Sequence, residues 1–207
     1  MILRIVGVIH RDPLHRQRLE DYFVHCRESG CENPCFLATE WDEETFSKVK
    51  AQREVIRTLL KGKWPQASED LINKIMLTLA FEGDTHTKIY PQVEILWLDQ
   101  GRQDERPGES GKGFAISLGV TTELYKLSID DSNFLQKLSE AILCETPGPT
   151  GEDERDGKWA HLILNRITQC DDGWAIVIVG KNHAGETEGS MRRLLEAAGQ
   201  QCEVFFL

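Results

Sequence analysis

The feature that most constrains the fold of this chain is a series of short, almost wholly apolar segments. Residues 2–9 and 174–179 carry nearly uninterrupted apolar side chains, and shorter apolar runs occur at 35–39, 93–98 and 202–206. Strands that are buried on both faces have this composition, which is typical of parallel sheets. We therefore expect these five segments to be strands of one central sheet.

The segments between the apolar runs show helical spacing of their apolar side chains. Ser68 is a suitable N-cap for one of these helices, and Gly199 is a suitable stop for the last. The expected helices cover residues 14–28, 43–61, 68–82, 131–144, 152–169 and 187–198. Strands that alternate with helices predict an α/β fold with a largely parallel central sheet flanked by helices on both faces. We expect a single domain over residues 1–207, with the polar residues 100–113 as an inserted loop.

The charge of the chain restricts its partners. The formal net charge is −10, and an acidic surface argues against nucleic acid or an anionic membrane as the main partner. The N-terminal apolar stretch is short and interrupted by Arg4, unlike a secretory signal. No apolar run approaches the ~18 residues of a membrane-spanning helix. We therefore expect a cytoplasmic protein. Its sequence is compatible with a monomer or a homodimer.

Two of the predicted strands end in the same pattern, Gly-x-x-His. Gly7 and His10 close the first strand, and Gly180 and His183 close the strand at 174–179. Glycine permits a sharp turn or a close approach to a ligand. Open α/β sheets bind ligands beyond the carboxyl ends of their strands. Because neutral imidazole is both a metal ligand and a base near neutral pH, the pattern predicts a metal site or a His-based catalytic site.

Two further charged groups are candidates for the same site. Glu40 follows the strand at 35–39, where a carboxylate would ligate a metal or orient an imidazole. The alternative for Glu40 is the acidic start of a helix. Arg155 opens the helix at 152–169, and its forked donors suit a carboxylate, a phosphate or a developing oxyanion. The alternative for Arg155 is an exposed run of charges.

Three residues are candidates for substrate binding. Asp156 follows Arg155 at the start of its helix, and Asp84 and His86 belong to a third Gly-x-x-His that follows a helix instead of a strand. We place Asp84 and His86 at the rim of the site. The alternative for them is a helix C-cap followed by polar loop residues.

The order of these motifs resembles that of the TraB/Tiki and ChaN/erythromycin-esterase-like superfamily. The resemblance covers most of the chain and is carried by a few short motifs. The matching residues are Gly7 and His10 in GVIH, Glu40 in FLATEWDE, Arg155 and Asp156 in ERDGKWAHLI, and Gly180 and His183 in VIVGKNH, with MRRLLEAAG similar to the closing helix of the family.

The resemblance implies a hydrolase of ester or amide bonds in a small molecule or peptide. Members of that superfamily include proposed metal-dependent peptidases, esterases that act through His and Glu, and an iron- or haem-associated protein. In a metal-dependent enzyme, His10, Glu40 and His183 would hold manganese, cobalt or zinc and leave a position for water. Without metal, His10 would be the general base, supported by Glu40, with Arg155 and His183 stabilising the oxyanion. The alternatives are a protein that binds metal, haem or a small ligand without turnover and, thirdly, an interaction module.

Overall fold

The computed structural model describes most of the chain on either side of a long central gap. The described residues are 1–9, 13–29, 33–40, 43, 47, 57–58, 61–62, 64–78, 90–99, 154–170 and 173–207. Of the predicted features, His10, Asp84, His86, the loop at 100–113 and the helix at 131–144 lie outside the described residues.

The described strands form one sheet in which every neighbouring pair is parallel. The strands are β1 (Ile2–Val8), β2 (Leu37–Thr39), β3 (Ile95–Trp97), β4 (Trp174–Gly180) and β5 (Gln201–Phe206), in the order β3-β2-β4-β1-β5. The predicted α/β fold with a parallel sheet is therefore confirmed. Both β2 and β3 are shorter than their apolar runs, although Leu98 N still donates to Thr39 O (2.9 Å) beyond the end of β3.

The described helices include α1 (Pro13–Glu28), α3 (Glu69–Thr78), α7 (Glu154–Ile167) and α8 (Met191–Ala197). The expected cap of α3 is present, because Leu71 N donates to Ser68 Oγ (3.2 Å). The prediction that the last helix starts at residue 187 is wrong. Gly189 has a φ of 80°, which is outside the helical region, and Ser190 caps α8 by accepting a hydrogen bond from Arg193 N.

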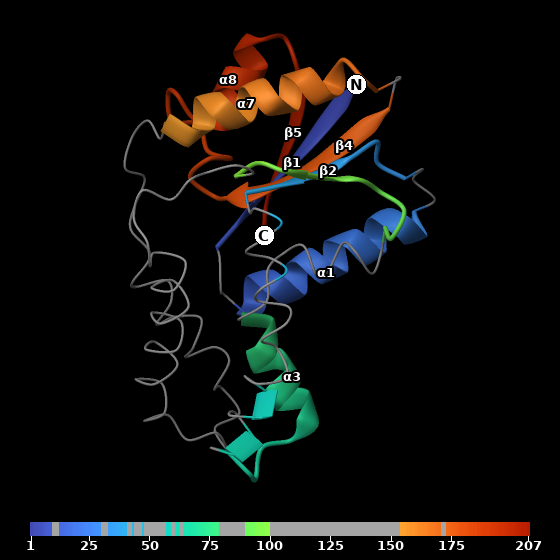
Figure 1. Ribbon diagram of the computed structural model, residues 1–207, viewed down its shortest axis with the longest axis vertical. Coiled ribbons are helices and arrows are strands. Elements are labelled where there is room, and N and C mark those ends of the chain that lie inside the picture. Colours follow the sequence, from blue (N-terminus) through green and yellow to red (C-terminus); the bar gives the residue numbers. More distant parts are fainter. Residues whose placement is uncertain are drawn as a thin grey trace.

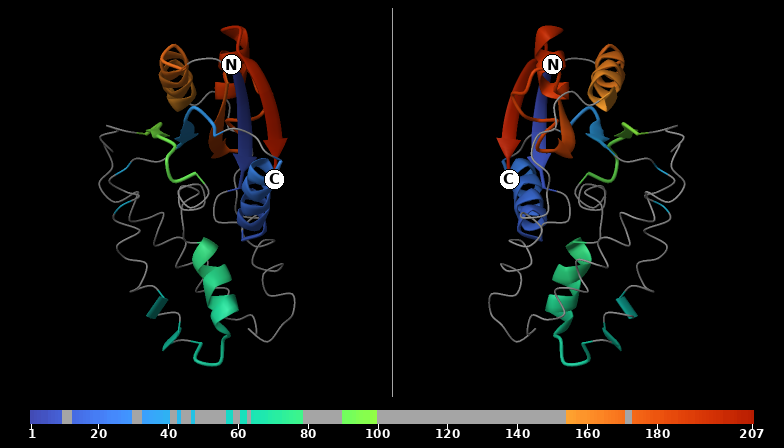
Figure 2. Two further views of the ribbon diagram at one scale, coloured as in Figure 1. Left: turned by 90° about the vertical axis from the view of Figure 1, so that its right-hand side faces the viewer. Right: turned by 90° about the vertical axis from the view of Figure 1, so that its left-hand side faces the viewer.

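Helices cover both faces of the sheet (Figures 1 and 2). On one face, α7 and α8 pack over Leu3 and Ile5 of β1, and on the other face α1 packs over Val6 and Val8. Successive side chains of a strand point to opposite faces. Because helices pack on both faces, all four of these β1 side chains are buried. This double coverage explains why the strands are almost wholly apolar.

The chain leaves neighbouring strands in opposite directions across the sheet. From β1 it passes through α1 to β2, and from β4 it passes through α8 to β5 on the other side. These helices lie on opposite faces, as right-handed crossovers require. Val8 of β1 is in register with Gly180 of β4. The carboxyl ends of β1 and β4 therefore meet at a topological switch point, the usual ligand position in such sheets.

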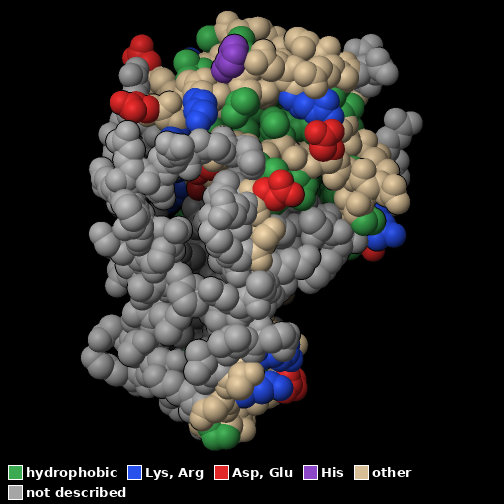
Figure 3. All heavy atoms as spheres, viewed as in Figure 1, with side chains coloured by type: hydrophobic (Ala, Val, Ile, Leu, Met, Phe, Trp, Pro, Cys, Tyr) green, Lys and Arg blue, Asp and Glu red, His purple; other side chains and the backbone are tan. Residues whose placement is uncertain are grey.

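The surface carries ion pairs between elements that are far apart in the sequence. Arg166 of α7 contacts Glu94 before β3 (Nη2–Oε2, 2.5 Å), and Arg4 of β1 contacts Glu203 of β5 (Nε–Oε2, 3.2 Å). Figure 3 shows acidic, basic and apolar side chains interspersed near α7 and α8. Because exposed pairs of this kind stabilise a fold by about 0–1 kcal/mol, the core supplies most of the stability.

Within the described residues, no helix combines the length and apolar character needed to cross a membrane.

Candidate functional site

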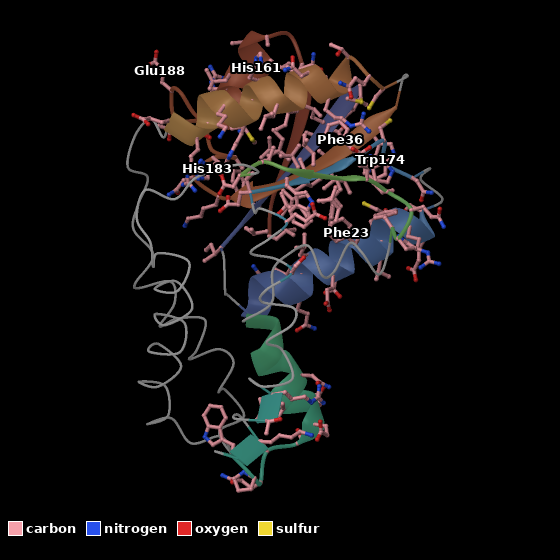
Figure 4. The ribbon with its side chains drawn as sticks, in the orientation of Figure 1. Phe23, Phe36, His161, Trp174, His183 and Glu188 are labelled. Carbon is pink, nitrogen blue, oxygen red and sulfur yellow. The ribbon has the colours of Figure 1, made fainter. Side chains whose placement is uncertain are left out.

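The centre of the candidate site is a buried pair formed by His183 and Asp156. His183 lies in the turn after β4, where its backbone N–H donates to Gly180 O (2.9 Å). Figure 4 shows His183 beside the start of α7. Its Nδ1 lies 2.9 Å from Asp156 Oδ1, and the exposed fractions are 9% for His183 and 3% for Asp156. Because a carboxylate only accepts, we assign the imidazole proton to Nδ1, which leaves Nε2 with its lone pair.

Asp156 is itself fixed from two sides. The same Oδ1 accepts a hydrogen bond from the backbone N–H of Met191 (2.8 Å), the first residue of α8. The carboxylate therefore connects the first turn of α7, the start of α8 and the turn after β4. It lies on the Nδ1 side of the imidazole and is almost completely buried. This placement favours a positioning role over the substrate contact expected from the sequence.

Arg155 lies on the other side of the imidazole. Its Nη2 is 3.3 Å from His183 Nε2, and its Cζ is 5.0 Å from the centre of the Trp159 ring. A guanidinium has donors and no acceptor, so this contact requires Nε2 to accept. The two nitrogens of His183 thus face groups of opposite charge, Asp156 at Nδ1 and Arg155 at Nε2.

The pKa of His183 is raised above its ordinary value of 6.5. Burial is the largest single influence and lowers this pKa, because it disfavours the charged imidazolium. The hydrogen bond to Asp156 and the negative charges of Glu40 and Asp156 raise it, and together they outweigh burial and the opposing charge of Arg155. The imidazole therefore stays protonated to a higher pH than a free histidine.

Glu40 lies at the same edge of the sheet. It directly follows β2, and its Oε2 accepts a hydrogen bond from the backbone N–H of Gly180 (2.7 Å), the last residue of β4. The structure thus brings Glu40, Arg155, Asp156 and His183 together at the carboxyl edge. The other three predicted members, His10, Asp84 and His86, lie outside the described residues.

The two Gly-x-x-His glycines have different surroundings. Gly7 lies inside β1, where a Cβ atom would come within 2.8 Å of the Phe206 ring and 3.0 Å of Ala184 Cβ. It is therefore a packing residue, not the site of the sharp turn or ligand contact that we expected. Gly180 instead supplies the backbone N–H that holds Glu40.

Two residues near the site were not among the candidates. Trp159 of α7 has no exposed surface, and its ring lies edge-on to His183 with a centroid distance of 4.8 Å. Its Nε1 donates to Asp99 Oδ1 (3.0 Å). Asp99 directly follows the predicted strand at 93–98, and Glu40 directly follows the predicted strand at 35–39. Selecting acidic residues at the ends of predicted strands, as was done for Glu40, would also have selected Asp99. In the sequence, Trp159 is indistinguishable from an ordinary core aromatic residue.

Of the three predicted metal ligands, Glu40 and His183 are described and His10 is not. No group of three or more His, Cys, Asp or Glu suited to hold an ion occurs among the residues that the structure describes. His183 presents Nδ1 to Asp156 and Nε2 to a guanidinium, which repels a cation. A metal at Nε2 would therefore require Arg155 to move away.

Comparison with known proteins gives one structural similarity. No family model and no curated protein matches the chain. Among solved structures, the chain is similar to the type III effector HopBA1, with a TM-score of 0.39 and 10% sequence identity, over 98% of this chain and 75% of the other. The description of the site therefore depends on the chain's own residues.

Proposed function

We propose that this protein is a hydrolase of ester or amide bonds in a small molecule or peptide, with His183 as its general base. The observation that carries the proposal is an imidazole with one nitrogen fixed by a buried carboxylate and the other beside a guanidinium. A carboxylate that orients an imidazole in this way is a recurring element of acyl-transfer sites. A raised pKa makes the neutral imidazole a stronger base than a free histidine.

Each residue of the site has a distinct role in this proposal. Asp156 holds the proton on Nδ1 and stabilises the imidazolium that forms during the reaction. When the Arg155 guanidinium turns from Nε2 to the substrate, Nε2 of His183 is free to remove a proton from the attacking water, and Arg155 stabilises the oxyanion that develops on the substrate. Glu40 raises the basicity of the imidazole through its charge. The base is thus His183 in place of His10, because Asp156 orients His183.

A substrate screen with matched histidine variants tests the proposal. Chromogenic esters and fluorogenic peptides are incubated with the wild type, with His183→Gln and with His161→Gln. His161 is exposed on the same region of the fold and contacts Asn165, so it controls for removal of an imidazole (Figure 4). We expect His183→Gln to lose about 100-fold or more in turnover, since general bases contribute about 10²–10⁴-fold, and His161→Gln to match the wild type.

The proposal is contradicted if the wild type hydrolyses none of the substrates, or if His183→Gln retains wild-type turnover. Circular dichroism of each variant establishes that it is folded, so that a loss of turnover is not a loss of structure.

Metal-dependent hydrolysis is the second candidate, because Glu40 and His183 lie at the same edge of the sheet on either side of Gly180. Elemental analysis after incubation with manganese, cobalt or zinc separates it from the metal-free mechanism. If the wild type binds metal stoichiometrically and folded His183→Gln does not, the metal-dependent mechanism is favoured over the metal-free one. A haem titration of the same two proteins, followed by absorbance, tests binding without turnover.

A further inference from the structure

We infer that Trp159, held by Asp99, is a positioning residue that sets the place of Arg155 against His183. Its catalytic consequence rests on the proposed function, but its structural consequence does not. The indole contacts both groups: the Arg155 Cζ lies 5.0 Å from its centre, and the His183 ring lies 4.8 Å away. One ring thus contacts both the guanidinium and the imidazole.

The position of Trp159 in α7 explains its contact with Arg155. Residues four apart in a helix lie on the same side, so the guanidinium of Arg155 reaches the indole one turn further along. Tryptophan is the aromatic side chain that attracts a cation most strongly, and the attraction increases away from water. Trp159 is completely buried, and Arg155 is half-buried above it. The indole therefore provides a fixed surface on which the guanidinium rests.

Asp99 determines the orientation of that surface. An indole has a single donor, Nε1–H, and when buried it needs a partner. The Trp159 Nε1 donates to Asp99 Oδ1 at 3.0 Å across 60 residues of sequence. Asp99 directly follows Leu98, whose N–H is bonded to Thr39 O of β2. The end of β3 is thereby connected, through one hydrogen bond, to the ring under Arg155.

The titration of His183 reports whether Arg155 stays in place. The charged groups that influence this imidazole are Asp156 and Arg155 of α7 and Glu40 after β2, while Arg192 of α8 is paired with Glu196 (2.9 Å). Arg155 is the positive member of this set and lowers the pKa of His183. A guanidinium that moves away from Nε2 will therefore let this pKa rise.

Two variants test the inference without removing a catalytic group. Trp159→Phe keeps an aromatic ring but removes the N–H and reduces the cation–π surface, and Asp99→Asn keeps an acceptor oxygen but removes its charge. The imidazole signals of His183 are followed by NMR as a function of pH. We expect a higher pKa in Trp159→Phe, a smaller shift the same way in Asp99→Asn, and the largest shift in Arg155→Met.

Trp174→Phe is the matched control. On the α1 face of the sheet, the Arg4 Cζ lies 4.6 Å from the centre of the Trp174 ring. The same chemical change is thus made under an arginine remote from His183. We expect the titration of His183 in this variant to equal that of the wild type.

The inference is overturned if the His183 titration in folded Trp159→Phe and Asp99→Asn equals that of the wild type while Arg155→Met shifts it. If the wild type hydrolyses a substrate, we also expect Trp159→Phe to lower kcat by on the order of 10- to 100-fold, because small misplacements of catalytic groups have effects of this size. If no substrate is found, the proposed function fails, but the NMR comparison still decides the positioning role.

Discussion

Replacing Asp156 by asparagine removes the charge behind His183 with little change in shape. Asp156 is buried and accepts hydrogen bonds from His183 Nδ1 and Met191 N through one oxygen. The amide of asparagine keeps one acceptor oxygen but brings a donor in place of the other. We expect the pKa of His183 to fall, because the hydrogen bond to Asp156 and its charge both raise that pKa in the wild type.

The size of the effect depends on pH. A hydrogen bond to a charged group contributes about 1.5–3 kcal/mol and one between neutral groups about 0.5–1.5 kcal/mol, so the neutral acceptor of asparagine destabilises the variant by about 1–1.5 kcal/mol for each hydrogen bond. A further ~1.4 kcal/mol is lost for each unit by which the pKa of His183 falls. Because the folded-state pKa of His183 is raised, this second contribution is fully present below the unfolded-state value and disappears as the pH rises through the folded-state value.

Urea unfolding at about pH 5.5 and about pH 8.5, below and above the ordinary histidine pKa of 6.5, measures both contributions. We expect the difference in the free energy of unfolding between wild type and Asp156→Asn to be larger at the lower pH. Glu154→Gln is the matched control, since Glu154 is an exposed acid in the same helical turn. An equal difference at both pH values, with an unchanged pKa of His183 by NMR, would contradict the proposed coupling between Asp156 and His183.

Three further predictions concern packing and charge near the site. Gly7→Val, which forces a side chain against the Phe206 ring, should lower the free energy of unfolding by about 1–3 kcal/mol, and unchanged urea unfolding would contradict the packing role. Gly157→Ala should raise it by about 0.5–1 kcal/mol, because a Cβ there meets nothing within 4 Å in α7; a loss of stability would show that this space is not open. Glu40→Gln should lower the pKa of His183 measured by NMR, since the charge of Glu40 raises it, and a rise would refute that assignment.

The fold was predictable because its main signal is local. Near-continuous apolar runs identify strands buried on both faces, and the structure places helices on both sides of them. The boundaries were less predictable, because the start of α8 depends on the left-handed conformation of Gly189 and the cap at Ser190. Apolar spacing alone extended that helix to residue 187.

The placement of the candidate residues was predictable where it depends on the ends of strands. Glu40 and His183 lie together at the carboxyl edge, because parallel strands place their carboxyl ends at one edge. The contacts of Asp156, Trp159 and Asp99 were not predictable, because each joins elements that are distant in the sequence. The Trp159–Asp99 hydrogen bond, for example, exists only once α7 is packed beside the end of β3.

In the proposed function, Asp156 holds His183 as the base of a hydrolytic site. The most direct test compares the pH dependence of kcat/KM for a hydrolysed ester with the NMR titration of His183 in the free protein. We predict that kcat/KM rises with pH through an apparent pKa above 6.5 that coincides with that of the imidazole, and that both fall together in Asp156→Asn. A kcat/KM profile that ignores the His183 titration, or that is unchanged in Asp156→Asn, would contradict the claim.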